Sequence, residues 1–212
     1  MTKQQIFLAL KNEVFLLHVR WETYEKIYGK SEERFLLINS AAPSFFHHIQ
    51  FILLDDIELI ISKILDPAET KGNKNLSLEQ LIIQFNDYGE DITDELTFRL
   101  SKIREKAKDI RERRNKRLSH YDLNASVSRN KDLFTKASRK VIKEILKDVS
   151  EYLNIIDYRI YNTTTIYDFS SAPGDAESLI NCLKKCESYK ALEKENVIEH
   201  GFWRTKGPFH DA

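Results

Sequence analysis

The sequence predicts an all-α protein, an up-and-down bundle of about five to six helices. Glycine and proline together account for only ten of the 212 residues, well below the roughly 12% that is usual. A β-sandwich, a barrel or a doubly wound fold needs many turns rich in these two residues, so those folds are disfavoured. Long segments also repeat apolar residues every three or four positions, which is the period of an amphipathic helix.

The first part of the chain contains three expected helices. Residues 2–28 form the first, which should end near Gly29, with an apolar face of Ile6, Leu10, Val14, Leu17, Trp21 and Tyr24. Pro43 suits a first helical turn. It opens a strongly apolar helix that stops before Pro67 and that we expect to be the central, most buried one. After a polar loop over 68–75, Ser77 and Gln80 form a possible capping box for a short helix to about Tyr88.

The second part contains two long helices and a shorter one. Residues 92–119 have the clearest seam, formed by Leu96, Leu100, Ile103, Ala107 and Ile110. Residues 131–161 repeat this behaviour. A connector follows over 162–174, and Asp175 could cap a helix to about Glu195 before an irregular tail. We therefore expect residues 1–161 to form the bundle and 162–212 to form a connector, a short helix and a tail that pack on it.

Arg114 stands where the seam of the 92–119 helix calls for an apolar residue, four positions after Ile110. Burial of an unpaired guanidinium costs several kcal/mol, so it must be paired, lie in a cleft or face another subunit. The same turns bring Arg113, Arg117 and His120 onto one adjacent flank. A histidine among arginines resists protonation unless an anion such as phosphate lies between them.

Charge is unevenly distributed although the chain as a whole is neutral, with 33 basic and 33 acidic residues. From Arg99 to Arg117 there are ten basic and three acidic residues, and from Arg129 to Lys147 there are seven and two. Such a positive region is the usual partner of a phosphate backbone, with salt-dependent binding. The alternative is a solvated helix surface with no ligand.

Residues 114–120, RNKRLSH, resemble the motif of the HEPN superfamily: an arginine, a polar residue and, a few positions later, a histidine at the end of a long bundle helix. The segments LLDD at 53–56 and LSL at 76–78 make the chain look like the abortive-infection branch of that superfamily, found in bacterial phage defence. The resemblance covers roughly residues 40–160.

The resemblance implies a metal-independent endoribonuclease that cleaves single-stranded RNA in phage defence or as a toxin. It implies that His120 is the general base or acid, that Arg114 stabilises charge on the phosphoryl group and that Asn115 orients His120 or the substrate. The RNA-binding residues would be Arg111, Arg113, Lys116 and Arg117. On one straight helix Arg114 and His120 diverge by about 120°, so a shared phosphate needs a bent helix end or residues from two subunits.

The expected partners are RNA, a second copy of the chain in a homodimer, and an antitoxin or other defence protein. The resemblance implies no cofactor and no metal. No apolar stretch is long enough to span a bilayer, so we expect no membrane partner and a cytoplasmic protein. Cys182 and Cys186 are expected to be packing residues or surface thiols, in keeping with a reducing compartment.

Other functions stay open at the level of the sequence. The arginines could serve a non-catalytic RNA- or nucleotide-binding module or scaffold, or the chain could be a purely structural bundle. His47 and His48 with Asp55 and Asp56 could ligate a metal. Pairing of one of these aspartates with a basic residue of a neighbouring helix is the better expectation.

Two further kinds of side chain bear on the chemistry. Ser119 beside His120 is a poor nucleophile candidate, because adjacent helical residues point about 100° apart. Among the aromatic residues, Tyr167 and Phe169 on the connector are the best candidates for stacking on bases. Those at helical spacing, Tyr152, Tyr158 and Tyr161, are expected to pack in the core.

Overall fold

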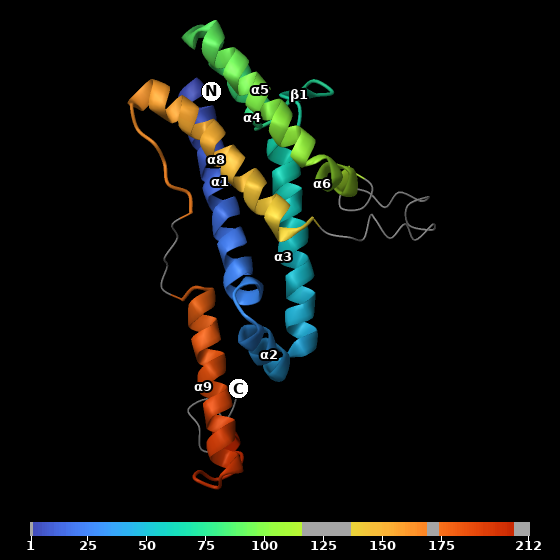
Figure 1. The fold of residues 1–212 in the computed structure, drawn as a ribbon, viewed down its shortest axis with the longest axis vertical. Coiled ribbons are helices and arrows are strands. Elements are labelled where there is room, and N and C mark those ends of the chain that lie inside the picture. Colours follow the sequence, from blue (N-terminus) through green and yellow to red (C-terminus); the bar gives the residue numbers. More distant parts are fainter. Residues whose placement is uncertain (1, 116–136, 169–173, 206–212) are drawn as a thin grey trace, which may run out of the picture. The chain divides into compact units, whose positions relative to one another are not determined.

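A computed structural model describes residues 2–115, 137–168 and 174–205 of the chain (Figure 1). In this part of the chain, helices are the dominant structure. The β-structure described is one hairpin, in which β1 (Glu69–Thr70) pairs antiparallel with β2 (Asn73–Lys74). The predicted all-α fold class is therefore confirmed, and the predicted polar loop at 68–75 contains this small hairpin.

The helices before the hairpin follow the predicted pattern closely. Helix α1 runs from Lys3 to Tyr24 and continues as a π-helical turn over Glu25–Gly29. Between it and the next predicted helix the structure has a helix that was not predicted, α2 (Glu32–Ala41), which the Ser31 side chain caps. Helix α3 (Pro43–Ile64) begins at the proline, as predicted.

The helices after the hairpin include the predicted caps. Ser77 caps α4 (Leu78–Gln84), which a 3₁₀ turn at Asn86–Tyr88 follows. The next helices are α5 (Glu90–Lys106), α6 (Lys108–Arg113) and α8 (Arg139–Tyr161). Asp175 caps α9 (Ala176–Lys194) by accepting hydrogen bonds from the Glu177 and Ser178 backbone N–H groups. The tail contains a short helix, α10 (Phe202–Thr205), where the sequence predicted irregular chain.

The chain divides into two compact units, residues 1–22 with 51–170 and residues 23–50 with 171–212. The predicted division at residue 161 is a different one and stays a prediction. The second unit has its own apolar core, to which α2, α3 and α9 contribute Ile38, Phe46 and Ile180. Ion pairs of Lys26 with Asp175 (2.7 Å) and of Arg34 with Glu177 (2.6 Å) fix the first turn of α9 in this unit.

The core of the first unit contains the seams of α5 and α8, which lie side by side (Figure 1). Leu96, Leu100, Ile103 and Ile110 are all buried, as predicted. Tyr152 of α8 is fully buried, and its hydroxyl donates to the Leu78 carbonyl oxygen at 2.9 Å. Its predicted role as a core residue is therefore confirmed. The same prediction is wrong for Tyr158 and Tyr161, which are exposed because they lie off the buried face of α8.

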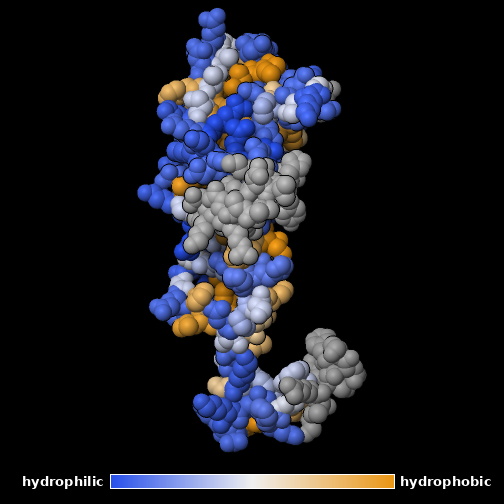
Figure 2. Space-filling model, turned by 90° about the vertical axis from the view of Figure 1, so that its right-hand side faces the viewer, coloured by the Kyte–Doolittle hydropathy of each residue, from blue (hydrophilic) through white to orange (hydrophobic). Residues whose placement is uncertain are grey.

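Helix α3 is less buried than the sequence predicted. Its apolar residues Phe45, Phe51 and Ile52 are exposed, whereas Ile57, Ile61 and Ile64 are buried. A strongly apolar composition therefore does not make this helix central along its whole length. Figure 2 shows one face of the molecule as mostly hydrophilic and interrupted by separate hydrophobic patches.

The predicted long helix over 92–119 is interrupted. Helix α5 ends at Lys106, and Ala107, which is fully buried, has backbone angles of φ −88° and ψ 8° before α6 begins at Lys108. After α6, Arg114 and Asn115 are π-helical. Residues 116–119 lie outside the described residues. Ile103 and Ile110, on the two sides of the interruption, are both buried, as predicted.

The connector after α8 packs against the first unit through polar contacts. Thr165 exchanges backbone hydrogen bonds with the Asn154 side chain, at 2.7 and 3.1 Å. Tyr167 is buried and its ring stacks on His18, with 5.5 Å between the centroids. The expectation that Tyr167 stacks on RNA bases is wrong, because the ring is already covered; Phe169 lies outside the described residues.

Within the described residues, no helix combines the length and the apolar character needed to cross a bilayer.

Candidate functional site

Three arginines of α6 and its end meet the C-terminal half of α3 and the turn that follows it. Arg111 and Arg113 lie on α6, and Arg114 follows directly. The carboxylates opposite them are Asp55 and Glu58 on α3 and Asp66 just beyond it. The partners of each hydrogen bond are 48 to 58 positions apart in the sequence, so only the fold brings them together.

Arg113 occupies the innermost position of this cluster. Its guanidinium donates to Glu58 through Nη1 and to Asp55 through Nη2, and it is only 2% exposed. The next buried position after Ile110 is therefore Arg113, three residues further on. The sequence predicted that it would be Arg114, four residues further on. In this arrangement the Arg113 guanidinium is not accessible to a nucleic-acid backbone.

Glu58 joins the chain on both sides of residues 116–136. The Arg113 guanidinium binds its Oε2, and the Ala137 backbone N–H donates to its Oε1 at 3.1 Å. The carboxylate itself is fully buried. Removing one member of such a buried ion pair leaves an uncompensated charge, which costs several kcal/mol. Glu58 therefore binds both Arg113, which precedes the motif arginine Arg114, and Ala137.

Arg114 lies nearer the surface, with 18% of its side chain exposed. It donates through Nη2 to Asp66 Oδ1, and Arg111 Nη2 lies 3.9 Å from the same oxygen. Asn115 is exposed. Arg114 is thus paired, and it is partly open to solvent.

A fourth arginine, Arg104 of α5, completes the network. Its Nη1 donates to Glu79 Oε1 at 3.0 Å, and its other nitrogens bind the Leu65 and Asp66 carbonyl oxygens at the end of α3. A cation near a helix C-terminus is favourable because carbonyl groups there lack helical partners. The hydrogen bond from Arg104 lowers the pKa of Glu79, which stays ionised.

The motif histidine and part of the predicted RNA-binding set cannot be placed. These residues, Lys116, Arg117, Ser119 and His120, lie outside the described residues. That Arg114 and His120 meet at one phosphate therefore stays a prediction. The described members behave differently from one another, since Arg113 is buried while Arg111 and Arg114 share one carboxylate. The catalytic assignments and the RNA-binding assignments of Arg111, Lys116 and Arg117 stay predictions. Arg113 does not fit its predicted RNA-binding role, because it is buried and bound to Glu58 and Asp55.

The positive excess expected along α5 and α6 is largely balanced by acidic residues from other helices. Of eight described basic residues from Arg99 to Arg114, all but Lys108 form an ion pair that the structure describes. Examples are Lys106 with Asp148 of α8 at 2.6 Å and Arg99 with Glu151 at 3.3 Å. A count of charges along the sequence misses these partners because they are distant in the chain.

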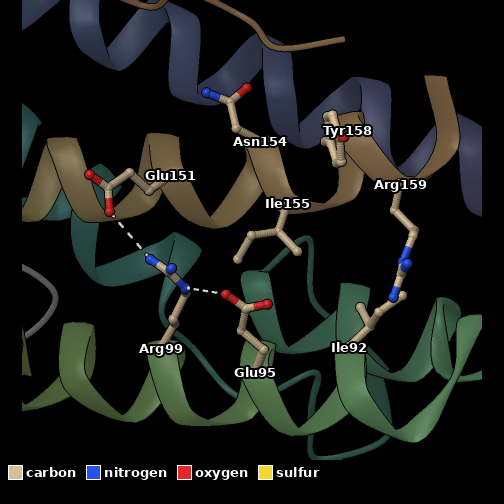
Figure 3. A pocket seen from close by; sticks show the side chains of 8 residues that line it. All are labelled: Ile92, Glu95, Arg99, Glu151, Asn154, Ile155, Tyr158 and Arg159. Atoms are coloured by element: carbon tan, nitrogen blue, oxygen red, sulfur yellow. Dashed lines mark hydrogen bonds and ion pairs between the residues drawn. The ribbon is translucent and has the colours of Figure 1, made fainter. Parts of the chain in front are cut away.

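A groove between α5 and α8 was not predicted (Figure 3). It has a volume of about 420 Å³ and is lined by Ile92, Glu95, Arg99, Glu151, Asn154, Ile155, Tyr158 and Arg159. Arg99 extends across it, binding Glu95 of its own helix at 3.0 Å and Glu151 of α8. Its charged side chains are already paired, and Tyr158 at its edge is 63% exposed.

The alternative metal site is not formed in the described part of the chain, where no three His, Cys, Asp or Glu side chains are grouped to hold an ion. Asp55 binds Arg113, and Asp56 binds Arg20 of α1 at 2.7 Å. The prediction that one of these aspartates pairs with a basic residue of another helix is therefore confirmed. Cys182 and Cys186 are exposed and free, as predicted for surface thiols.

The comparisons with known proteins agree with the motif. The HEPN family AbiU2 matches residues 4–196, which extends on both sides of the region covered by the resemblance. No curated protein and no solved structure matches the chain significantly. Because the family match covers nearly the whole sequence, the chain belongs to the AbiU2 family of HEPN domains, in the abortive-infection branch of that superfamily.

Proposed function

We propose that this protein is a metal-independent endoribonuclease of the HEPN type that cleaves single-stranded RNA, in phage defence or as a toxin. The family membership supports the general class. The observation that carries the proposal is the state of Arg114, a partly exposed guanidinium that already binds an anionic oxygen. Arginine forks suit carboxylate and phosphate oxygens alike.

In the proposed reaction the RNA supplies its own nucleophile. His120 takes the proton of the ribose 2′-hydroxyl, the 2′-oxygen attacks the adjacent phosphorus, and the bond from phosphorus to the 5′-oxygen breaks. The 5′-oxygen receives a proton from a general acid, His120 of this chain or of a second copy. Arg114 stabilises the charge on the five-coordinate phosphorus, and Asn115 orients His120 or the substrate. The products are a 2′,3′-cyclic phosphate and a 5′-hydroxyl, and no cofactor takes part.

The other predicted residues receive distinct roles in this proposal. Arg113 is a positioning residue, because its guanidinium is committed to Glu58 and Asp55. Arg111, Lys116 and Arg117 bind the phosphate backbone. The active form is a homodimer, which would bring two copies of Arg114 and His120 to one cleft, and an antitoxin or another defence protein controls it.

Cleavage of a labelled single-stranded RNA in the presence of a chelator tests the proposal. We expect Arg114→Ala and His120→Ala each to lower the rate by about a hundredfold or more, the size seen when a transition-state donor is removed. Arg99→Ala is the matched control, since it removes an arginine of the same helical stretch that lies on the α5–α8 groove. Product ends should be cyclic phosphate and 5′-hydroxyl.

A different result would favour a different class. If the parent protein binds RNA without cutting it, and His120→Ala leaves that binding intact, the chain is a non-catalytic RNA-binding module. Cleavage that stops when the chelator is added would contradict the metal-independent mechanism. Thermal unfolding of each variant must match that of the parent before its rate is interpreted.

A further inference from the structure

Asp66 lies at the centre of a small cluster whose members all remain partly open to solvent. Its Oδ1 accepts the hydrogen bond from Arg114 Nη2 and lies 3.9 Å from Arg111 Nη2. The exposed fractions of these side chains are 21% for Asp66, 18% for Arg114 and 30% for Arg111. A ligand could reach this oxygen position from solvent, unlike the sealed Arg113–Glu58 pair.

The carboxylates are unevenly shared among the arginines. Arg104, Arg111 and Arg114 share Asp66 and Glu79. The neighbouring Arg113 alone binds two, Asp55 and Glu58. Both Glu79 oxygens are engaged, Oε1 by Arg104 and Oε2 by the Ala68 backbone N–H at 2.6 Å. Among the described residues, Asp66 is therefore the one carboxylate that pairs with both Arg111 and Arg114.

The guanidinium groups also retain unused hydrogen-bonding capacity. The Nε atoms of Arg111 and Arg114 are buried and make no hydrogen bond in the described structure. Burial lowers the pKa of Arg111, and the charges of Arg104 and Arg114 lower it too, whereas the carboxylates of Asp66 and Glu79 raise it. An additional anionic oxygen would offset more of the repulsion among the three guanidinium groups.

We infer that the Asp66 carboxylate holds Arg111 and Arg114 in the free protein and competes with the phosphate of the substrate for them. The ligand class is the phosphodiester of single-stranded RNA, so the inference rests on the proposed function and names the group that substrate must displace. A phosphodiester offers two non-bridging oxygens to two guanidinium forks, whereas both described contacts of Asp66 use one oxygen. Asp66 thus competes with substrate and raises the RNA concentration needed for occupancy.

Binding of a fluorescent, single-stranded 2′-O-methyl RNA, measured by anisotropy, tests this inference. This probe lacks the 2′-hydroxyl nucleophile and cannot be cleaved by the proposed reaction. We expect Asp66→Asn to tighten binding by about tenfold, the size of one additional charge-assisted hydrogen bond to phosphate. The plot of log affinity against log salt should also become steeper, by about 0.7 for each further phosphate neutralised.

Asp56→Asn is the matched control. It removes the same charge from the same part of the chain, and Asp56 pairs with Arg20, outside the cluster. The double variant Asp66→Asn with Arg111→Gln should return to the affinity of the parent. If Asp66→Asn destabilises the fold in thermal unfolding, Asp66→Ser replaces it in the same assay.

Two outcomes would overturn the inference. One is an affinity of Asp66→Asn that is equal to or weaker than that of the parent. The other is an equally tightened affinity in Asp56→Asn, which would mean that only net charge matters. Both affinities are measured without cleavage. A parent protein that fails to cut ordinary RNA would therefore refute the proposed function, and the binding test of Asp66 could still be carried out.

Discussion

Arg99 of α5 and Arg113 of α6 each contact two carboxylates, yet their surroundings differ. Arg113 and Glu58 have exposed side-chain fractions of 3% and 0%, whereas those of Arg99 and Glu151 are 38% and 47%. Water screens the second pair and is excluded from the first. Burial decides the role of each arginine, and spacing along the sequence does not.

Arg114 lies between these two extremes. The side chains of Arg114 and Asp66 are 18% and 21% exposed. This intermediate burial fits the substrate-binding role proposed for Arg114. The following predictions test this ranking by burial.

The largest effect is expected for the buried pair. Glu58→Ala or Arg113→Ala leaves an uncompensated charge and should lower the free energy of unfolding by about 3–5 kcal/mol. Urea denaturation followed by circular dichroism measures the loss. Replacing both residues together, by Glu58→Leu and Arg113→Met, should recover much of it. A loss below about 1 kcal/mol for either single variant would mean that the pair is solvated and that the comparison fails.

A smaller effect is expected for a buried group without charge. Tyr152→Phe removes the hydroxyl that donates to the Leu78 carbonyl and should cost about 1 kcal/mol in the same urea experiment. Tyr158→Phe is the control, because that tyrosine is exposed. Equal losses for the two variants would argue against burial as the deciding factor.

His18 tests the ranking through protonation. Burial lowers the pKa of His18, and the charge of Asp168 opposes this only in part. The unfolded chain therefore binds the proton at higher pH than the folded one. Stability should fall as pH drops below the ordinary histidine value of about 6.5. Urea midpoints across this range should fall less in His18→Gln; an unchanged slope would show that other groups cause the loss.

The smallest effect is expected for the exposed pair on the α5–α8 groove. Arg99→Ala or Glu151→Gln should change the free energy of unfolding by less than about 0.5 kcal/mol. Added salt should reduce even this difference, since exposed charges are screened over about 10 Å at 0.1 M. A loss comparable to that of Arg113→Ala would contradict the comparison directly.

Much of the fold was predictable because it depends on local chemistry. Pro43 begins a helix because its ring fixes φ and its missing N–H is not needed there. Ser77 and Asp175 cap helices through side-chain oxygens that bind N–H groups two or three residues away. The buried face of α5 follows from the helical period.

The candidate site was predictable only in part. The motif identified the end of α6 as the region of interest, and the family match supports that class of protein. The break at Ala107 was not predicted, because alanine favours helix and gives no local signal to stop. The burial of Arg113 in place of Arg114 was not predicted either, because its partners Glu58 and Asp55 lie 55 and 58 positions away in the sequence. Tyr167 is buried by a similarly unpredicted stacking on His18.

The sequence alone determined the helical class, the main caps and the family, since these depend on residue type and on spacings of a few positions. Tertiary structure alone decided which arginine is buried and which carboxylate each one binds. Glu58 and Arg113 are 55 residues apart, and Asp66 and Arg114 are 48 apart. Partners at such separations are chosen by the packing of whole helices, and burial then sets how strongly each pair interacts.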